Sequence, residues 1–200
     1  SCEMCHGPGS KHVKAMSKDT IINPVNLNAI QQYQLCGQCH SRVTNKNEKD
    51  LAFPQDFFIG NTDLQDRVEF WTYSTNPNFF WPNDFASKNR QQYQDIQKNK
   101  HQNVGVTCTT CHDVHSSKIG YAQVRGDKSM LCASCHTANA EMYAKSVKDK
   151  SGVNCTDCHM AKIANRAGGT KKTEEHWDTS SHTFKVIMPH TADELKMRSS

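Results

Sequence analysis

The chain has 200 residues and a formal net charge of +4, from 24 Lys and Arg against 20 Asp and Glu. Only 36% of its residues are hydrophobic and 8% are aromatic, so its side chains offer little apolar surface to offset the entropy lost on folding. The sequence contains no run of 18 or more apolar residues, which excludes a transmembrane helix. The small positive charge is not the footprint of a nucleic-acid-binding protein, so we expect no nucleic acid partner.

The cysteines follow one pattern: all ten belong to five copies of Cys-x-x-Cys-His. Two thiols at this spacing can each form a thioether with one vinyl group of a haem, and the following histidine is the proximal ligand of the iron. The sequence therefore predicts five covalently bound haem c groups. The thioether residues are Cys2, Cys5, Cys36, Cys39, Cys108, Cys111, Cys132, Cys135, Cys155 and Cys158, and the proximal ligands are His6, His40, His112, His136 and His159.

Two other uses of paired cysteines are less consistent with the pattern. A disulfide framework also has an even number of cysteines, but it does not require a histidine after every second one. A zinc site pairs two Cys-x-x-Cys motifs and has no need of the added histidine.

Five haems would supply the apolar surface that the polypeptide lacks. We therefore expect a mainly α fold with extensive loops and little secondary structure, wrapped around a stacked chain of haems and unfolded without them. Each haem also adds two carboxylates, which the basic side chains would compensate. Haem attachment of this kind takes place outside the cytoplasm, so we expect an extracytoplasmic protein, with the extracellular space or cell surface favoured over the periplasm.

Residues 1–43 form a predicted two-haem segment. A Gly-Pro-Gly turn at residues 7–9 follows the first motif and brings His12 back toward the haem layer. Residues 25–35 predict a short helix that leads into the second motif. The first cysteine is residue 2 and no signal peptide is visible, so we expect numbering that begins after a cleavage, or a fragment of a larger protein.

Residues 44–100 contain no cysteine. A polar loop is predicted at 44–50, and ten aromatic residues crowd the stretch from Phe53 to Phe85. Four interleaved Gly and Pro residues exclude a long helix there. The rings would pack on porphyrin faces or, alternatively, form a docking surface for a partner. A polar helix is predicted at 86–100.

Residues 101–160 form a predicted three-haem segment, with a helix at 138–149, and residues 161–200 form a tail that supplies distal ligands. We predict that the four segments together make one pentahaem domain, residues 1–200. No fixed-period repeat runs through the chain, which excludes a solenoid.

The histidines outside the motifs nearly match the distal positions that five haems would need. Six are present, so we expect most haems to have two histidine ligands, which leaves no open site for substrate. Three residues separate His112 from His115, a step too short for both to bind one iron, so His115 is expected to reach a neighbouring haem. The distal candidates are His12, His101, His115, His176, His182 and His190.

The motifs and their surroundings resemble the multihaem c-type cytochrome superfamily that includes pentahaem nitrite reductase, the tetrahaem carrier of ammonia oxidisers and extracellular cytochrome filaments. The matching pieces are Cys5-His6-Gly-Pro-Gly-Ser-Lys-His12, Asn89-Arg-Gln-Gln-Tyr93 leading to His101, Gly105-Val-Thr-Cys108-Thr-Thr-Cys111-His112-Asp-Val-His115-Ser, Leu131-Cys132-Ala-Ser-Cys135-His136, Cys155-Thr-Asp-Cys158-His159-Met160 and Ser181-His182-Thr-Phe184.

The resemblance implies parallel-stacked and T-shaped haem pairs, with distal roles for His12, His101, His115 and His182. It also exposes a difference, because such proteins often have a histidine between the last two motifs and residues 137–154 have none. The remaining haem would use His176, His190, Met142 or a histidine from a neighbouring chain.

These features predict an electron-transfer protein rather than an enzyme. Potential haems and ligands near both ends of the chain suit a polymerising extracellular filament with a possible inter-subunit ligand, so we favour a homo-oligomer that passes electrons to other redox proteins or extracellular acceptors. The alternatives are a discrete periplasmic carrier and a nitrite- or hydroxylamine-type oxidoreductase with one open haem. All five motifs end in His, whereas nitrite reductases of this superfamily carry Lys at the catalytic haem.

Overall fold

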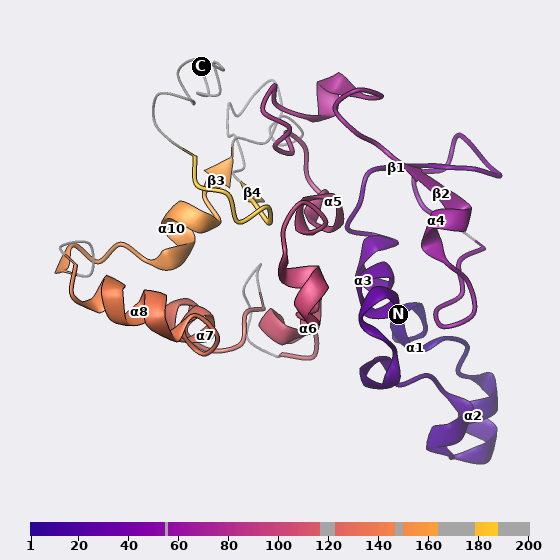
Figure 1. The fold of residues 1–200 in the computed structure, drawn as a ribbon. Coiled ribbons are helices and arrows are strands. Elements are labelled where there is room, and N and C mark those ends of the chain that lie inside the picture. Colours follow the sequence, from indigo (N-terminus) through magenta and orange to yellow (C-terminus); the bar gives the residue numbers. More distant parts are fainter. Residues whose placement is uncertain (55, 117–122, 147–149, 164–178, 188–200) are drawn as a thin grey trace, which may run out of the picture. The chain divides into compact units, whose positions relative to one another are not determined.

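The fold consists of short helices joined by long loops, with two small antiparallel sheets (Figure 1). The computed structural model describes residues 1–54, 56–116, 123–146, 150–163 and 179–187. This architecture confirms the predicted fold class, with little regular secondary structure and more helix than strand. The helices are α1 (Glu3–His6), α2 (Ser10–Ala15), α3 (Ala29–Gly37), α4 (Leu64–Arg67), α5 (Gln92–Ile96), α6 (Cys108–Cys111), α7 (Lys128–Ala133), α8 (Thr137–Ala144) and α10 (Cys155–His159), and the 3₁₀ turns are η1 (Lys18–Thr20), η2 (Pro24–Asn26), η3 (Pro77–Phe79) and η4 (His101–Val104).

The chain divides into two compact units. Unit 1 comprises Ser1–Asn76 and Arg90–Thr107, and unit 2 comprises Pro77–Asn89 with the described part of Cys108–Ser200. The first two motifs lie in unit 1 and the other three in unit 2, so the aromatic segment is shared between them. A single pentahaem domain over residues 1–200 stays a prediction. Among the described residues, no helix is long and apolar enough to span a membrane.

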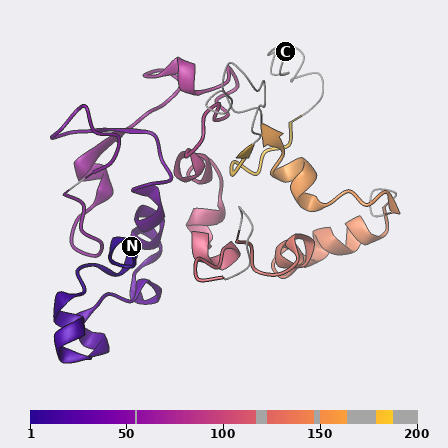
Figure 2. The same ribbon diagram turned by 180° about the vertical axis from the view of Figure 1, so that it is seen from behind.

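Unit 1 has a core of six buried apolar side chains beneath a two-stranded sheet. Strands β1 (Val43–Asn45) and β2 (Val68–Phe70) pair with Val43 opposite Phe70, and they lie side by side in both ribbon views (Figure 2). Helix α4 precedes β2 and carries Leu64, which is fully buried. The core is therefore built around the sheet rather than around the motifs; its members are Leu35, Val43, Phe57, Ile59, Leu64 and Val68.

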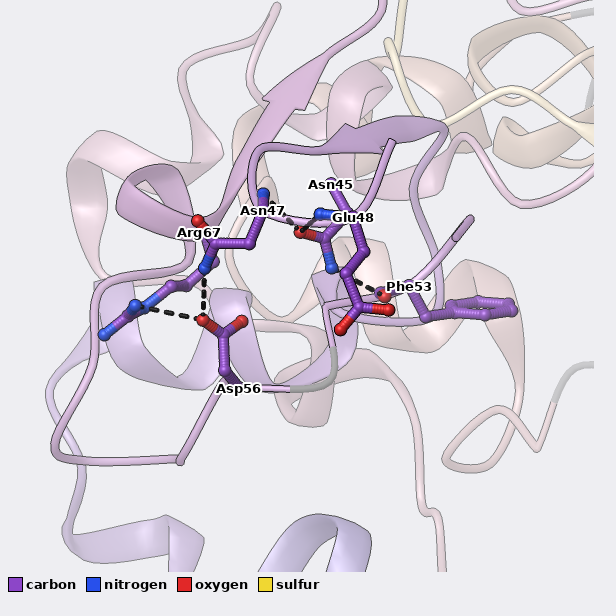
Figure 3. A network of polar contacts seen from close by, with 6 residues as sticks. All are labelled: Asn45, Asn47, Glu48, Phe53, Asp56 and Arg67. Carbon is purple, nitrogen blue, oxygen red and sulfur yellow. Dashed lines mark hydrogen bonds and ion pairs between the residues drawn. The ribbon is translucent and has the colours of Figure 1, made fainter. Parts of the chain in front are cut away.

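A buried asparagine organises the loop that follows β1 (Figure 3). The side-chain oxygen of Asn45 accepts hydrogen bonds from the backbone N–H groups of Asn47 (2.9 Å) and Glu48 (3.1 Å). Its side-chain nitrogen donates to the carbonyl of Phe53 at 3.2 Å. Asn45 is 2% exposed, so it does not belong to the surface loop predicted at 44–50. These three contacts close the loop on itself.

The carboxylate of Asp56 also holds this loop. One oxygen of Asp56 accepts from the Asn47 side chain at 2.7 Å and lies 3.0 Å from the Arg67 guanidinium (Figure 3). Both charged side chains are 37% exposed, so this ion pair contributes at most about 1 kcal/mol. The loop is therefore held mainly by Asn45.

Two predicted helices differ from the observed ones. The helix expected at 25–35 begins at Ala29, because Asn28 and Gln31 form a capping box that fixes its start. The helix expected at 86–100 is wrong over most of its length. Only α5 is α-helical there, and Arg90 has a φ of 65°, which a right-handed helix cannot include.

Unit 2 has a smaller core, which a short arm of the chain completes. The arm comprises residues 77–89 and folds back on itself, with Phe80 bridged to Ala86 and the Trp81 N–H donating to the Phe85 carbonyl at 2.8 Å. Trp81 and Phe85 pack with Ile163, which lies in strand β3 (Lys162–Ile163) beside β4 (Thr179–Ser180). The arm thus joins the strand after the fifth motif to the loop that carries His182, since Ile187 also packs there.

The aromatic residues of 44–100 differ in exposure, and Phe70, Trp71 and Phe79 are half-buried. Phe57, Phe80, Trp81 and Phe85 are buried within protein cores, whereas Phe53, Phe58 and Tyr73 are 40–56% exposed. Packing against haem or a partner therefore stays a prediction for the exposed rings only.

Replacing Asn45 tests the loop. The Asn45→Ala change removes the three hydrogen bonds of a buried side chain, so we expect a loss of about 1–3 kcal/mol of unfolding free energy. The measurement is urea unfolding of the holoprotein followed by far-UV circular dichroism. Asn47→Ala is the control, since Asn47 is exposed and should cost less than about 1 kcal/mol. Equal losses would contradict the role given to Asn45.

Candidate functional site

Each of the five motifs closes a single helical turn. In the first four, the histidine N–H donates to the carbonyl of the first cysteine, at 2.9 Å (His6), 2.8 Å (His40), 2.9 Å (His112) and 3.0 Å (His136). The fifth motif forms all of α10, whose start is capped by Asn154 and Asp157. A helical turn places residues three and four apart on one face, so both thiols and the imidazole can reach the same group.

The ten thiols are available for thioether bonds. All ten cysteines lie in the described part of the chain, and none of them forms a disulfide there. Nowhere in that part do three His, Cys, Asp or Glu side chains converge as a metal ion would need. This geometry fits attachment of one haem at each motif better than a disulfide framework or a zinc site.

In six histidines, the Nδ1 atom lies within hydrogen-bonding distance of an oxygen atom. The Nδ1 atom faces a backbone carbonyl in four of them: His6 with Ile22 (2.8 Å), His12 with Ser17 (2.9 Å), His182 with Ser180 (3.0 Å) and His159 with Phe184 (3.4 Å). In the other two it faces a side-chain amide oxygen: His40 with Gln92 (3.3 Å) and His101 with Asn99 (3.0 Å). Because these oxygens can only accept, Nδ1 carries the proton and Nε2 presents a lone pair. Metal-binding histidines in proteins are commonly held in this state.

The described distal candidates are split between the units. His12 lies in α2 and His101 opens η4, both in unit 1 with the first two motifs. His115 is exposed in the loop after α6, and His182 lies in the loop after β4, both in unit 2. The placement of His101 differs from the sequence grouping, which put it with the third motif. His176 and His190 lie outside the described residues.

One pair of histidines has the separation of two ligands on one metal. The ring centres of His112 and His182 are 6.2 Å apart and their planes differ by 28°. Two imidazoles bound to one metal ion from opposite sides have ring centres about 6.3 Å apart, because each metal–nitrogen bond is about 2 Å and each ring has a radius of about 1.1 Å. The space between these two rings therefore matches one iron atom.

Within each unit, thiols of different motifs lie close enough to raise one another's pKa. Burial raises the pKa of the Cys5 thiol and the Cys36 thiolate raises it further; likewise burial and then Cys5 raise the pKa of Cys39. In unit 2, burial is again the larger cause, followed by Cys135 for the pKa of Cys111 and by Cys155 and Cys111 for that of Cys132. The first two motifs thus adjoin one another, as do the third, fourth and fifth.

Large apolar side chains stand exposed next to the motifs. Met4 lies inside the first motif, Val114 follows the third, and Met130 precedes the fourth, and these side chains are 52%, 53% and 71% exposed. Met142, the alternative ligand between the last two motifs, is 67% exposed on α8. A porphyrin bound at each motif would cover apolar surface of this kind, and the residues present therefore fit haem.

Tyr93 belongs to a piece of the sequence that resembles the superfamily, but its contact with the second motif was not predicted. Tyr93 in α5 is 4% exposed, stacks on Phe70 with ring centres 5.0 Å apart, and donates its N–H to the His40 carbonyl at 3.0 Å. Its ring packs so closely on Gly37 that a Cβ there would lie 2.7 Å from it. Glycine inside the second motif is thus required by a contact 56 positions away in the sequence.

Comparisons with known proteins agree with this geometry. The family model of the doubled CXXCH motif matches residues 101–141. The chain is 25% identical over 163 residues to the multiheme cytochrome MtrA of Shewanella baltica. It superposes on the crystal structure of the outer cell wall cytochrome OcwA with a TM-score of 0.78 over 98% of its length, at 24% identity, which shows the same fold. The chain is a multihaem c-type cytochrome.

The cytochrome corresponds to only part of each relative. It is also 28% identical over 159 residues to the dissimilatory sulfite reductase MccA of Wolinella succinogenes. These matches cover 80% and 79% of the cytochrome but 18% of MccA and 34% of MtrA, and the OcwA match covers 52% of that chain.

The contact between Tyr93 and Gly37 can be tested by adding one methyl group. We expect Gly37→Ala to lower the unfolding free energy of the cytochrome by about 1–3 kcal/mol, because the ring must move. Urea unfolding measures this. Gly9→Ala is the matched control, since its Cβ would meet only the flexible end of Glu3 at 3.2 Å. A Gly37→Ala protein as stable as the control would contradict the contact.

Proposed function

We propose that this cytochrome conducts electrons through five haem c groups, most of them held by two histidines. The observation that carries the proposal is the His112–His182 pair, whose ring centres lie 6.2 Å apart, a separation that two axial ligands of one iron would have. An iron with both axial positions filled exchanges electrons without binding a substrate. The ten cysteines supply the thioether bonds and the five motif histidines the proximal ligands.

This geometry supports a partial assignment of the distal ligands. His182 is assigned to the haem of the third motif. His12 and His101 are assigned to the two haems of unit 1, because they share that unit with the first two motifs. His115 is assigned to a neighbouring haem of unit 2. For the remaining haem, His176, His190, Met142 and a histidine of a neighbouring chain stay alternatives.

The neighbouring thiols support rapid exchange between haems. Haems attached at adjoining motifs would lie edge to edge within each unit, which is what electron hopping requires. The protein needs no catalytic group for this task. Its own residues hold six of the imidazoles in the tautomer that iron binds, and exposed apolar side chains beside the motifs would cover porphyrin faces.

We further propose that the cytochrome works outside the cytoplasm, at the cell surface or beyond it. Likeness to a cytochrome described as belonging to an outer cell wall supports this location. A polymerising filament is the favoured assembly, with other redox proteins or extracellular acceptors as partners, and a discrete periplasmic carrier is the alternative. Electron microscopy of the purified protein separates the two; small single particles under all conditions would exclude the filament.

A reductase is the second candidate, because one relative is a sulfite reductase. Such an enzyme needs an iron with an open axial position. Addition of cyanide, nitrite or sulfite to the oxidised cytochrome would then change its absorption spectrum. The electron-transfer proposal expects no change.

The number of haems is a direct prediction. Mass spectrometry of the denatured protein should show a covalent mass increase equal to five haem c groups. The Cys108→Ser/Cys111→Ser double variant should lose one of them, because the third motif then has no thiols to form thioether bonds. Fewer than five in the wild type would contradict the proposal.

Removal of a distal ligand should change the spin state of one haem. We expect His182→Ala to convert one low-spin haem to a high-spin form that binds cyanide, because its iron loses an axial ligand. Electron paramagnetic resonance of the oxidised protein measures this change. Lys185→Ala is the control from the same loop. An unaltered low-spin spectrum in His182→Ala would contradict the assignment.

A further inference from the structure

The hydrogen-bond partner of His40 differs in kind from those of most other ring nitrogens. Four of the six Nδ1 atoms described above face backbone carbonyls, whose charge no substitution alters. His40 instead faces the side-chain oxygen of Gln92 at 3.3 Å. The acceptor on this one motif histidine is therefore a group that a single substitution can change in charge.

Gln92 is held in place by its neighbours on α5. The next residue, Tyr93, donates its N–H to the His40 carbonyl. Two residues on, Gln94 accepts from the Arg42 N–H at 2.8 Å and donates to the Arg42 carbonyl at 3.0 Å, and Gln94 is only 7% exposed. The first turn of α5 is thus fastened to His40 and Arg42 through the two residues that directly follow Gln92.

The partner of a metal-bound imidazole controls how strongly that imidazole donates electrons. An acceptor at Nδ1 draws the proton outward and makes Nε2 more basic, and a carboxylate does so more than an amide. A more basic ligand favours ferric over ferrous iron and lowers the reduction potential. Loss of the acceptor has the opposite effect.

We propose that Gln92 is a positioning residue for His40: its neutral amide oxygen accepts the hydrogen bond of the Nδ1–H group and thereby sets the reduction potential of the haem at the second motif separately from the other haems. This inference rests on the proposed function, since it requires a haem bound at Cys36, Cys39 and His40. Gln92 would thus be a residue that is not itself an iron ligand but adjusts the reduction potential of one haem in the electron path.

The test is a redox titration of three variants followed by haem absorbance. Gln92→Glu keeps the size and adds charge, so it should shift one haem, one fifth of the absorbance change, to lower potential. We expect at least a tenfold change in its reduction equilibrium, about 59 mV for one electron. Gln92→Met removes the acceptor and should shift the same fraction to higher potential.

Gln97→Glu provides the matched control for charge alone. Gln97 is exposed at the end of α5, and it adds the same charge five residues from Gln92. Opposite shifts in Gln92→Glu and Gln92→Met, with a smaller one in Gln97→Glu, support the inference. Equal shifts in both Glu variants, or no shift in either Gln92 variant, would overturn it.

A haem count on the wild type separates this inference from the proposed function. A wild-type protein without haem at the second motif would overturn the proposed function and the role of Gln92 together. A full complement of haem with potentials indifferent to Gln92 would overturn the role of Gln92 alone.

Discussion

Burial of apolar surface is the constraint on which this structure depends, and the polypeptide provides too little of it. The described core of unit 1 contains six buried apolar side chains and that of unit 2 only three. Meanwhile Met4, Val114 and Met130 stand exposed beside the motifs. Covering apolar side chains that contact water stabilises the folded protein. A porphyrin attached at a motif would lie beside these exposed side chains. We therefore expect the haems of this cytochrome to contribute to its folding as well as to its chemistry.

The same loops that lack regular structure have a defined task. They carry carbonyl oxygens to the Nδ1 atoms of histidines, as Ile22 does for His6 and Ser17 for His12. A long helix or strand would use its carbonyl oxygens in its own hydrogen bonds. Short helical turns and irregular loops leave such oxygens available for the imidazoles.

Much of the site could be predicted because attachment of haem c is local. Five residues in one helical turn contain both thiols and the proximal imidazole, so the motif alone indicates the cofactor. The helix before the second motif was also predicted, but it begins later than expected, directly after Asn28.

The parts that sequence reasoning missed are contacts between distant segments. The helix predicted at 86–100 was too long because Arg90 adopts a left-handed conformation that its residue type does not indicate. The packing of Tyr93 on Gly37, the contact of Gln92 with His40 and the pairing of His182 with His112 depend on how the loops fold back. Ligand counting showed that enough histidines were present, but only the fold brings particular histidines together.

The central claim is that the cytochrome folds around its haems. The most direct measurement is amide hydrogen exchange, with far-UV circular dichroism, on a chain in which all ten cysteines are replaced by serine. The account predicts rapid exchange throughout and no cooperative unfolding transition, because the apolar surface supplied by the haems is missing. Protected amides and a cooperative transition like those of the holoprotein would contradict it.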